Sequence, residues 1–508
     1  MRTHSLGQFG FIRGASKFTM QTHPTPPLRT ETSTAPAEGA AKERSWLARA
    51  NITVEPVMLA HMFAFMLTSV VGQSFLVQRA CRVHLGLPES VCSSIQEPQF
   101  KEDAARVQIE VSNFHQYNGI VYNFVPVFLA PFLGAWSDRR GRKLPLLMGL
   151  GGNTLYFAML ALVASQDTWR LEMILVLVSL PAALTGSGLA VFSATHCYVA
   201  DVTPTEDRTL RLAILDSCYL VAMPAGISLG AYLFGSVLDG SVTAMFAIST
   251  GFLAFCFVYS LLVLEWQTND AQKSLKGVNI CSDFFDKHHI VESIKTLCRP
   301  RSSHGRLYLF LILLSVGLYT FQRNEQQFTY LYTQMKFNWS VNEFSNYRTF
   351  QTIAYVFAML LGVPLFTKHC GFSDSVIVLT ASVAHAVAGV AFVAAEVPWV
   401  FYIGGAVSSL GPTGPPVLRS MASKLVSVDE RGKIFAILCV AETAMPILAS
   451  AVYSQVYNAT LESYPPAIFW VTIASQATVF IFILCVYASM RRSPAPPCHA
   501  AERSPPES

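Results

Sequence analysis

Apolar residues dominate twelve stretches of about 20 residues, and shorter polar segments separate them. A helix needs about 20 apolar residues to cross the hydrocarbon of a bilayer. Helices also satisfy their own backbone hydrogen bonds where lipid offers no partner. The pattern therefore predicts twelve membrane-spanning helices, at residues 56–77, 114–136, 144–166, 171–196, 209–234, 243–265, 307–328, 343–366, 373–395, 398–422, 433–456 and 466–489.

The longest interior polar segment follows the sixth predicted span and divides the spans into two sets of six. We therefore expect an N-terminal six-helix bundle at 56–265, a cytoplasmic central loop at 266–306 and a C-terminal six-helix bundle at 307–489. Residues 1–55 and 490–508 are rich in polar residues and proline, and we expect them to be disordered cytoplasmic tails. No apolar core typical of a cleavable signal peptide lies near Met1.

Composition and charge agree with a membrane protein. The chain is 52% hydrophobic and 13% charged, whereas soluble domains average about 25% charged residues. The net charge of +4 is too small to indicate a nucleic-acid partner. With a cytoplasmic N-terminus, 27 of the 36 Lys and Arg residues fall on the cytoplasmic side and 6 fall on the other side. This positive-inside asymmetry predicts that both termini are cytoplasmic.

An internal repeat supports the division into two halves. Arg208 is followed by the sequence Ala-Ile-Leu at 213–215 and by Ala-Met-Pro at 222–224. Arg431 is followed by the same two tripeptides at 436–438 and 444–446. These segments belong to the fifth and eleventh predicted spans, one in each half. Duplicated halves with a site between them are common in transporters.

The loop between the second and third predicted spans fits the pattern G-x-x-x-D-R-x-G-R-K, through Gly134, Asp138, Arg139, Gly141 and Arg142. Glycine is suited to places where backbones approach closely or take positive φ. An acid at the membrane edge can pair with arginine and with a helix N-terminus, and so hold a gate closed. The alternative is a plain basic loop, but the acid and the two glycines favour a gate. The motif resembles the signature of the major facilitator transporters.

Further segments resemble the proton-coupled folate transporter family, which is solute carrier family 46. They are Glu55-Pro56-Val57, LGAWSDRRGRK at 133–143, Ala200-Asp201-Val202, RTLRLAILDS at 208–217 and PPVLRSMASKL at 415–425. VSNF at 111–114 and GKIFAIL at 432–438 are more similar to the thymic stromal cotransporter of that family. The resemblance covers about residues 55–487. It implies an all-α integral membrane protein with the major facilitator fold, in which twelve helices form two pseudo-symmetric six-helix bundles.

The resemblance also implies roles for single residues. An acid at the place of Asp216 is linked to proton coupling in this family, and an arginine at the place of Arg419 is linked to substrate and proton handling. Ser187 stands where the family's folate transporter has an acid, and Gln322 stands in the region of its histidine, so folate itself is in doubt as a substrate. His288 and His289 resemble a histidine pair in the family's central loop, although a solvated loop is the simpler interpretation.

Charged residues inside apolar spans are costly and usually face a cavity or a partner. Arg323 and Glu325 lie in a polar run of the seventh span, and Glu442 lies in the eleventh span. We treat Asp216, Glu442 and Glu325 as candidates for proton coupling, and Arg419, Arg323 and Ser187 as candidates for substrate binding. The alternatives are a structural ion pair for Asp216, an arginine snorkelling to the membrane edge for Arg419, and an early helix end for the polar run. Single histidines on apolar faces, His61, His196 and His385, are expected to be structural.

Other residues indicate covalent features and no cofactor. Cys81 and Cys92 both lie in the first predicted outer loop, where a local disulfide is expected. Asn338 and Asn458 begin glycosylation sequons in predicted outer loops. The sequence shows no metal-ligand spacing, phosphate-binding loop or nucleophile–base set, so we predict no metal, no cofactor and no enzymatic activity. A proton gradient would supply the driving force.

The sequence therefore predicts a multi-pass membrane protein that imports a small organic anion together with protons by alternating access. By resemblance, the substrate is a folate-like or a muropeptide-like compound. One alternative is a drug/proton antiporter, because such proteins share the motif at 133–143. An alternative of another class is a membrane receptor or scaffold that does not transport. We expect location in the plasma membrane, with the endolysosomal membrane as the alternative; the oligomeric state is open.

Overall fold

The computed structural model describes residues 52–204, 207–268, 304–362, 364–366 and 371–492, together with 272–273, 277, 283–285 and 295–297. The predicted tails lie outside the described residues except at 52–55 and 490–492, as do most of the predicted central loop and its pair His288 and His289. The described chain is helical, and it contains no β-strand within these ranges.

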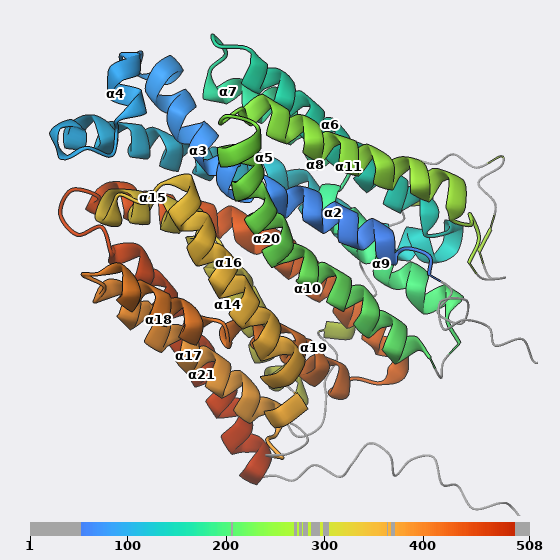
Figure 1. The fold of residues 1–508 in the computed structure, drawn as a ribbon. Coiled ribbons are helices and arrows are strands. Elements are labelled where there is room, and N and C mark those ends of the chain that lie inside the picture. Colours follow the sequence, from blue (N-terminus) through green and yellow to red (C-terminus); the bar gives the residue numbers. More distant parts are fainter. Residues whose placement is uncertain are drawn as a thin grey trace, which may run out of the picture. The chain divides into compact units, whose positions relative to one another are not determined.

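The described helices, labelled in Figure 1, form an N-terminal half from α2 to α11 and a C-terminal half from α14 to α21. The N-terminal half contains α2 (Glu55–Leu67), α3 (Ser69–Arg79), α4 (Glu89–Ser93), α5 (Lys101–Arg140), α6 (Lys143–Ser165), α7 (Leu171–Ile174), α8 (Leu180–Leu184), α9 (Ser187–Val202), α10 (Arg208–Tyr232) and α11 (Val242–Val263). The C-terminal half contains α14 (Gly305–Gln322), α15 (Glu325–Phe337), α16 (Val341–Phe357), α17 (Asp374–Val393), α18 (Pro398–Ser408), α19 (Gly414–Lys424), α20 (Val428–Thr460) and α21 (Ala467–Arg492).

Short π-helical and 3₁₀ turns join some of these helices into longer rods. The π-helical turn Ala80–His84 extends α3, Leu175–Ser179 joins α7 to α8, Leu233–Val237 extends α10, and Ala358–Gly362 extends α16. A 3₁₀ turn at Gly411–Thr413, which contains Pro412, lies between α18 and α19. Proline lacks the backbone N–H and favours such breaks.

Within the described ranges, nine helical stretches are long and apolar enough to cross a membrane: Glu55–His84, Lys143–Ser165, Leu171–Val202, Leu210–Val237, Val242–Val263, Gly305–Phe337, Asp374–Val393, Gly432–Thr460 and Ala467–Arg491. The other three predicted spans, at 114–136, 343–366 and 398–422, fall on the more polar rods built from α5, from α16, and from α18 with α19. All twelve predicted spans therefore fall on helical rods, while the count of twelve crossings remains a prediction.

Two helices run well past the ends that hydropathy predicts. Helix α5 has 40 residues and begins at Lys101, before the predicted start at 114. The seventh span does not end near 328, because α15 continues it to Phe337. Arg323 and Glu325 lie where α14 ends and α15 begins, near the middle of the helical stretch Gly305–Phe337.

The length of α5 defines two opposite faces of the described helices. At about 1.5 Å per residue, a helix of this length spans about 60 Å. Its first turn lies near Asn338, at the end that also carries the bond between Cys81 and Cys92. We call this end the disulfide face. Its last turn carries the motif at 134–143, and we call that end the motif face.

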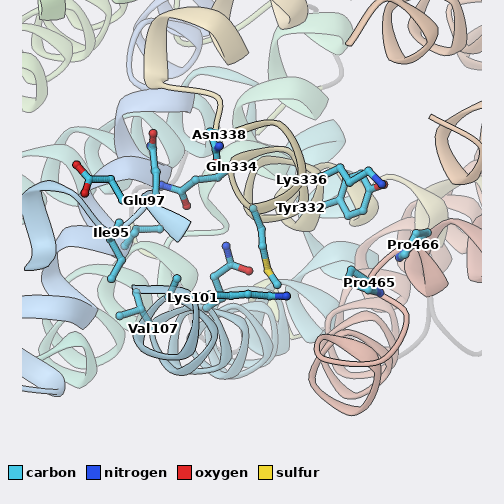
Figure 2. A pocket seen from close by; sticks show the side chains of 15 residues that line it. Ile95, Glu97, Lys101, Val107, Tyr332, Gln334, Lys336, Asn338, Pro465 and Pro466 are labelled. Carbon is cyan, nitrogen blue, oxygen red and sulfur yellow. The ribbon is translucent and has the colours of Figure 1, made fainter. Parts of the chain in front are cut away.

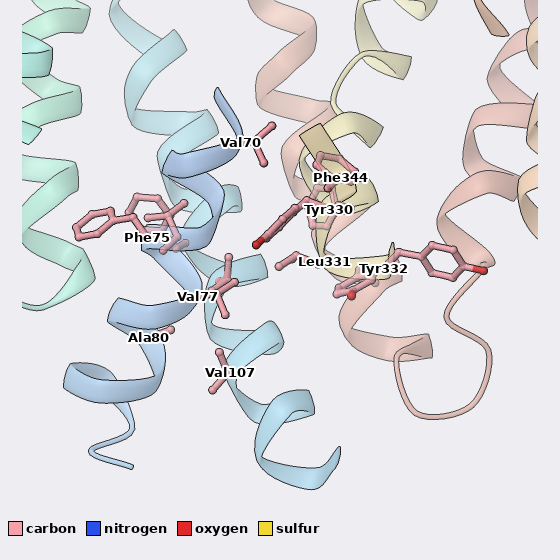
Figure 3. Close-up of a cluster of buried hydrophobic side chains, with 14 of the residues drawn as sticks. Val70, Phe75, Val77, Ala80, Val107, Tyr330, Leu331, Tyr332 and Phe344 are labelled. Carbon is pink, nitrogen blue, oxygen red and sulfur yellow. The ribbon is translucent and has the colours of Figure 1, made fainter. Parts of the chain in front are cut away.

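The buried apolar core is divided at the motif face and shared at the disulfide face. One cluster around Leu309, Leu418 and Ile483 lies wholly in the C-terminal half, and another around Met58, Leu150 and Val199 lies wholly in the N-terminal half. A third and larger cluster contains residues of both halves. Figure 3 shows part of it, with Val77 and Val107 on one side and Tyr330, Leu331, Tyr332 and Phe344 on the other. The two halves therefore share one core only near the disulfide face.

Polar contacts between α5 and α20 accompany this shared core. The hydroxyls of Ser112 and Ser454 lie 2.9 Å apart, and Ser454 Oγ also donates to the carbonyl of Ser112 over 3.0 Å. Tyr457 donates its hydroxyl to Gln108 over 2.7 Å, and Gln108 in turn donates to the carbonyl of Leu331 over 3.1 Å. Buried polar groups are costly unless paired, so these bonds stabilise the closed arrangement of the disulfide face.

Helices α2 and α10 approach each other through two glycines spaced four residues apart. A Cβ at Gly226 would meet Met66 Cβ at 2.7 Å, and a Cβ at Gly230 would overlap the carbonyl oxygen of Leu67. Small residues at this spacing allow close packing of membrane helices. The contact positions α10, which carries Asp216, against α2.

We predict that Gly230→Ala lowers thermal stability, because the added methyl group forces α10 away from the Leu67 backbone; overpacking of this kind costs about 1–3 kcal/mol. The measurement is the melting temperature of the purified protein in detergent. Gly251→Ala in α11 is the matched control, because a Cβ there meets nothing within 4 Å. Equal melting temperatures for the two variants would contradict the proposed close contact.

Candidate functional site

The predicted gate motif forms the corner between α5 and α6. Gly141 ends α5 with φ of 111°, a conformation that favours glycine, and a Cβ there would overlap the carbonyl oxygen of Trp266. Gly134 differs from the expectation: it lies inside α5, and a Cβ there would meet nothing within 4 Å. Of the two glycines in the motif, only Gly141 has a backbone conformation that requires glycine in the structure described.

The charges of the motif are paired within the N-terminal half. Arg142 is buried; it forms an ion pair with Asp138 and donates from Nε to Asp201 at the end of α9 over 2.9 Å. It also donates to the hydroxyl of Ser137 over 2.6 Å. The Asp138 side chain remains 61% exposed. None of these contacts reaches the C-terminal half.

A short piece of the segment after α11 covers the motif. Asp283 accepts two hydrogen bonds from Arg140, at 2.7 and 2.8 Å, and one from Trp136 Nε1 at 2.9 Å. Arg139 donates to the main-chain carbonyl of Asp283 over 3.0 Å. The hydrogen bonds from Arg140 hold the pKa of the Asp283 carboxyl below its ordinary value, so this carboxylate stays ionised.

Asp216 on α10 pairs with His196 on α9, whose Nε2 lies 3.0 Å from Oδ1 of Asp216. This contact between two helices was not predicted from the sequence. The side chain of Asp216 is 62% exposed. The other ionisable groups that interact with it are Tyr219 on its own helix and Tyr355 on α16. Asp216 thus lies on the open surface between the halves.

Arg419 and Glu442 form an ion pair between α19 and α20. Oε1 of Glu442 accepts from Nη2 of Arg419 over 2.6 Å and from Nε over 3.1 Å. The sequence predicted separate roles for these two residues, one with substrate and one with protons. The structure brings them together within the C-terminal half, 41% and 22% exposed.

Arg323, at the junction of α14 and α15, lies between two cavities. One cavity, of about 240 Å³, is lined by Arg323, Glu325 and Arg348, together with tyrosines of both halves. The other, of about 230 Å³, is lined by Arg323, Ser187 and Glu442, so it also joins the halves. Among the described residues, the guanidinium of Arg323 makes no ion pair or hydrogen bond. It is a cation available to a solute at the interface of the two halves.

Glu325 is buried beneath this arginine. It is 6% exposed and accepts a hydrogen bond from Thr472 on α21. Arg348 on α16 lines the same cavity and donates to Gln326 over 3.0 Å and to Gln351 over 2.6 Å. Arg348 was not among the site residues predicted from the sequence, although a positive charge in a predicted span is the signal that would have identified it.

Ser187 belongs to a buried chain of polar side chains. It has φ of 43°, which is uncommon outside glycine, and follows Gly186 at the start of α9. Its hydroxyl donates to Asn153 over 2.7 Å and contacts the hydroxyl of Tyr122. Asn153 in turn lies 2.9 Å from Nε2 of His61. Ser187 is 1% exposed and is held in this network of hydrogen-bonded side chains. It therefore contributes only to the wall of the 230 Å³ cavity.

A buried ion pair that was not predicted from the sequence joins α2 to α10. Glu55 and Arg211 are 5% and 6% exposed, and Nη2 of Arg211 lies 2.7 Å from Oε1 of Glu55. Arg211 also donates to the hydroxyl of Thr203 over 3.1 Å. Removing one partner would leave a buried charge unpaired, which is strongly destabilising. The pair fixes the end of α10 near the motif face.

The structure joins Cys81 to Cys92 through a disulfide. Asn338 lies in the turn after α15, is exposed and has φ of 55°. Asn458 does not lie in the predicted loop, because α20 continues to Thr460; its Nδ2 donates to Asn113 over 2.7 Å. The two predicted glycosylation sites therefore differ in accessibility.

Comparison with known proteins identifies the family. The model of the Major Facilitator Superfamily matches residues 112–369. A Drosophila melanogaster protein named probable peptidoglycan muropeptide transporter SLC46 is 24% identical over 426 residues, which is 81% of each chain. The proton-coupled folate transporter of Rattus norvegicus is 26% identical over 420 residues, 80% of this chain and 86% of that protein.

A solved structure agrees on the fold. The human organic anion transporter MFSD10 superposes with a TM-score of 0.58 at 16% identity, over 85% of this chain and 97% of that chain. The expected all-α membrane fold of the major facilitator type is thereby confirmed. The chain belongs to the Major Facilitator Superfamily and, within it, to solute carrier family 46.

Proposed function

We propose that this chain is a secondary active transporter that imports a small organic anion together with protons, and that Arg323 binds the anion. Its family consists of transporters, and the relatives include proteins named for muropeptide and for proton-coupled folate transport. A folate-like or muropeptide-like compound is therefore the proposed class of substrate. Both carry carboxylates on a larger polar or aromatic body.

The position of Arg323 is the observation that carries this proposal. Its guanidinium lines two cavities formed by both halves and has no anionic partner among the described residues. Arginine binds carboxylates through two parallel hydrogen bonds. The wall of the 240 Å³ cavity beside Arg323 also contains Gln322, Tyr219 and Tyr355. These side chains supply hydrogen bonds and aromatic surface for the rest of the substrate.

We predict that Arg323→Gln weakens substrate binding by roughly ten- to a hundredfold, because a charge-assisted hydrogen bond contributes about 1.5–3 kcal/mol. The measurement is the KM of radiolabelled uptake in proteoliposomes for folate, methotrexate and a muramyl dipeptide. Arg106→Gln is the matched control, since Arg106 is exposed and pairs with Glu102 on the surface of α5. An unchanged KM for every transported solute would refute the assignment of Arg323.

For proton coupling, we propose Asp216 as the primary site, with Glu442 and Glu325 as further candidates. Asp216 supports this role because it faces the open surface between the halves and hydrogen-bonds to His196, a residue type that commonly transfers protons. Glu442 is held by Arg419, and Glu325 is buried against Thr472. Arg419 would then steady Glu442 and would release it to the substrate or to a proton.

We predict that Asp216→Asn removes the difference between uptake at pH 5.5 and uptake at pH 7.4, because the amide cannot take up the coupling proton. The measurement is initial uptake at the two pH values in proteoliposomes. Asp239→Asn is the control, because Asp239 lies in the turn between α10 and α11, away from the cavities. A pH dependence of Asp216→Asn equal to that of the wild-type protein would show that this carboxylate is not required.

We further propose that the motif face is cytoplasmic and the disulfide face is extracellular or luminal, in the plasma membrane or in an endolysosomal membrane. The basic residues near the motif support this orientation, and so does a disulfide at the opposite face. In the conformation described, the disulfide face is closed. Asp138 and Arg142 would hold the motif face closed in the other conformation, when a helix of the C-terminal half approaches the exposed Asp138.

The orientation predicts glycosylation at Asn338 rather than at Asn458, because the amide of Asn458 is engaged by Asn113. The measurement is the change in gel mobility of the cell-expressed protein on enzymatic deglycosylation. Asn338→Gln should abolish the change, and Asn458→Gln should leave it intact. A mobility change that persists in Asn338→Gln would overturn the assignment of this site.

A further inference from the structure

A third cavity lies at the disulfide face, outside the site that we assign to the transported solute. Its volume is about 410 Å³, which is within the range of small-molecule sites. Figure 2 shows its walls. Ile95, Glu97, Lys101 and Val107 come from the N-terminal half, whereas Tyr332, Gln334, Lys336 and Pro466 come from the C-terminal half. The cavity is therefore built by both halves together.

Its lining contains a buried polar group without a partner. Tyr332 is 1% exposed, and its hydroxyl has no hydrogen-bond partner among the described residues. A buried hydroxyl without a partner costs free energy that a ligand acceptor would recover. Gln334, which is 6% exposed, adds an amide to the same wall. These two groups favour a ligand that carries hydrogen-bonding atoms.

The charges around the cavity favour an anion. Lys336 pairs with Glu396 over 3.0 Å, and Glu97 accepts a hydrogen bond from Gln99 over 2.7 Å. Lys101 is exposed and makes no ion pair among the described residues. It is also the first residue of α5, whose first turn has no side-chain cap. The positive charge of Lys101 thus lies at one end of the cavity, at the start of α5, whose first turn also contains Glu102 and Asp103.

The remaining lining is apolar, with Val77, Ile95, Val107, Met335 and Pro465. We propose that this cavity binds a small amphipathic organic anion from the solution at the disulfide face. The anionic group lies near Lys101, and the apolar body lies between the two halves. Opening of the disulfide face separates the walls, so the ligand binds only the closed conformation. Binding at this site therefore inhibits transport.

The probe for this test is 1-anilinonaphthalene-8-sulfonate, which combines one sulfonate with an aromatic body. It is added at the disulfide face during uptake by proteoliposomes of known orientation. We expect the maximal rate to fall and the inhibition to persist at saturating substrate. Lys101→Gln should raise the probe concentration that inhibits uptake by half roughly tenfold, because the substitution removes one charge-assisted contact. Arg106→Gln, which neutralises a charge on the same helix outside the cavity, should leave it unchanged.

Binding is measured separately, as the saturable fluorescence of the probe on protein in nanodiscs, and this readout does not depend on transport. Tyr332→Phe, which removes only the hydroxyl, should weaken saturable binding several-fold. Both readouts are repeated after deglycosylation, because Asn338 lies on the rim. Inhibition that raises only the substrate KM would refute the site. Equal inhibition and binding in wild type, Lys101→Gln and Tyr332→Phe would also refute it.

Discussion

The apolar core that the two halves share at the disulfide face is the interaction on which the rest of the described structure depends. Residues of α3 and α5 pack there against residues of α15 and α16, and hydrogen bonds between α5 and α20 continue the contact. Toward the motif face, each half keeps its own core. The shared core thus closes one face, while the surfaces of the halves that carry Asp216 and Arg323 remain accessible between them.

Charge in this interior is tolerated because almost every charged group has a partner. Glu55 is paired with Arg211, Arg419 with Glu442, and Asp216 with His196. Within the described residues, Arg323 differs because its guanidinium faces two cavities without an anion. An isolated charge inside a membrane protein is expensive, so it is expected to be retained for a solute that completes it. The proposed substrate supplies that missing anion in each transport cycle.

Hydropathy was sufficient to predict a helical membrane protein, because the bilayer permits few alternatives to spanning helices. The motif at 134–143 and the resembling segments also identified the family correctly. Helix ends were predicted less well, since α5 and α15 continue as polar helices past their apolar stretches, and hydropathy does not detect such extensions.

The pairing of the candidate residues could not be predicted either. His196 meets Asp216 across two helices, and Arg419 meets Glu442 across two others. Those contacts depend on helix rotation and packing, which one sequence does not specify. Arg348 and the pair of Glu55 with Arg211 were visible as charges in or beside predicted spans. Their importance became evident only when burial and partners were known.

The central claim is that the two halves rock about the cavities, closing one face as the other opens. Distances between spin labels test it directly, with one pair at Gln99 and Glu462 near the disulfide face and another at Asp207 and Ser427 near the motif face. When a transported anion is added at acidic pH, the account predicts a population in which the first distance lengthens while the second shortens. Distances that stay fixed, or that lengthen together, would contradict alternating access.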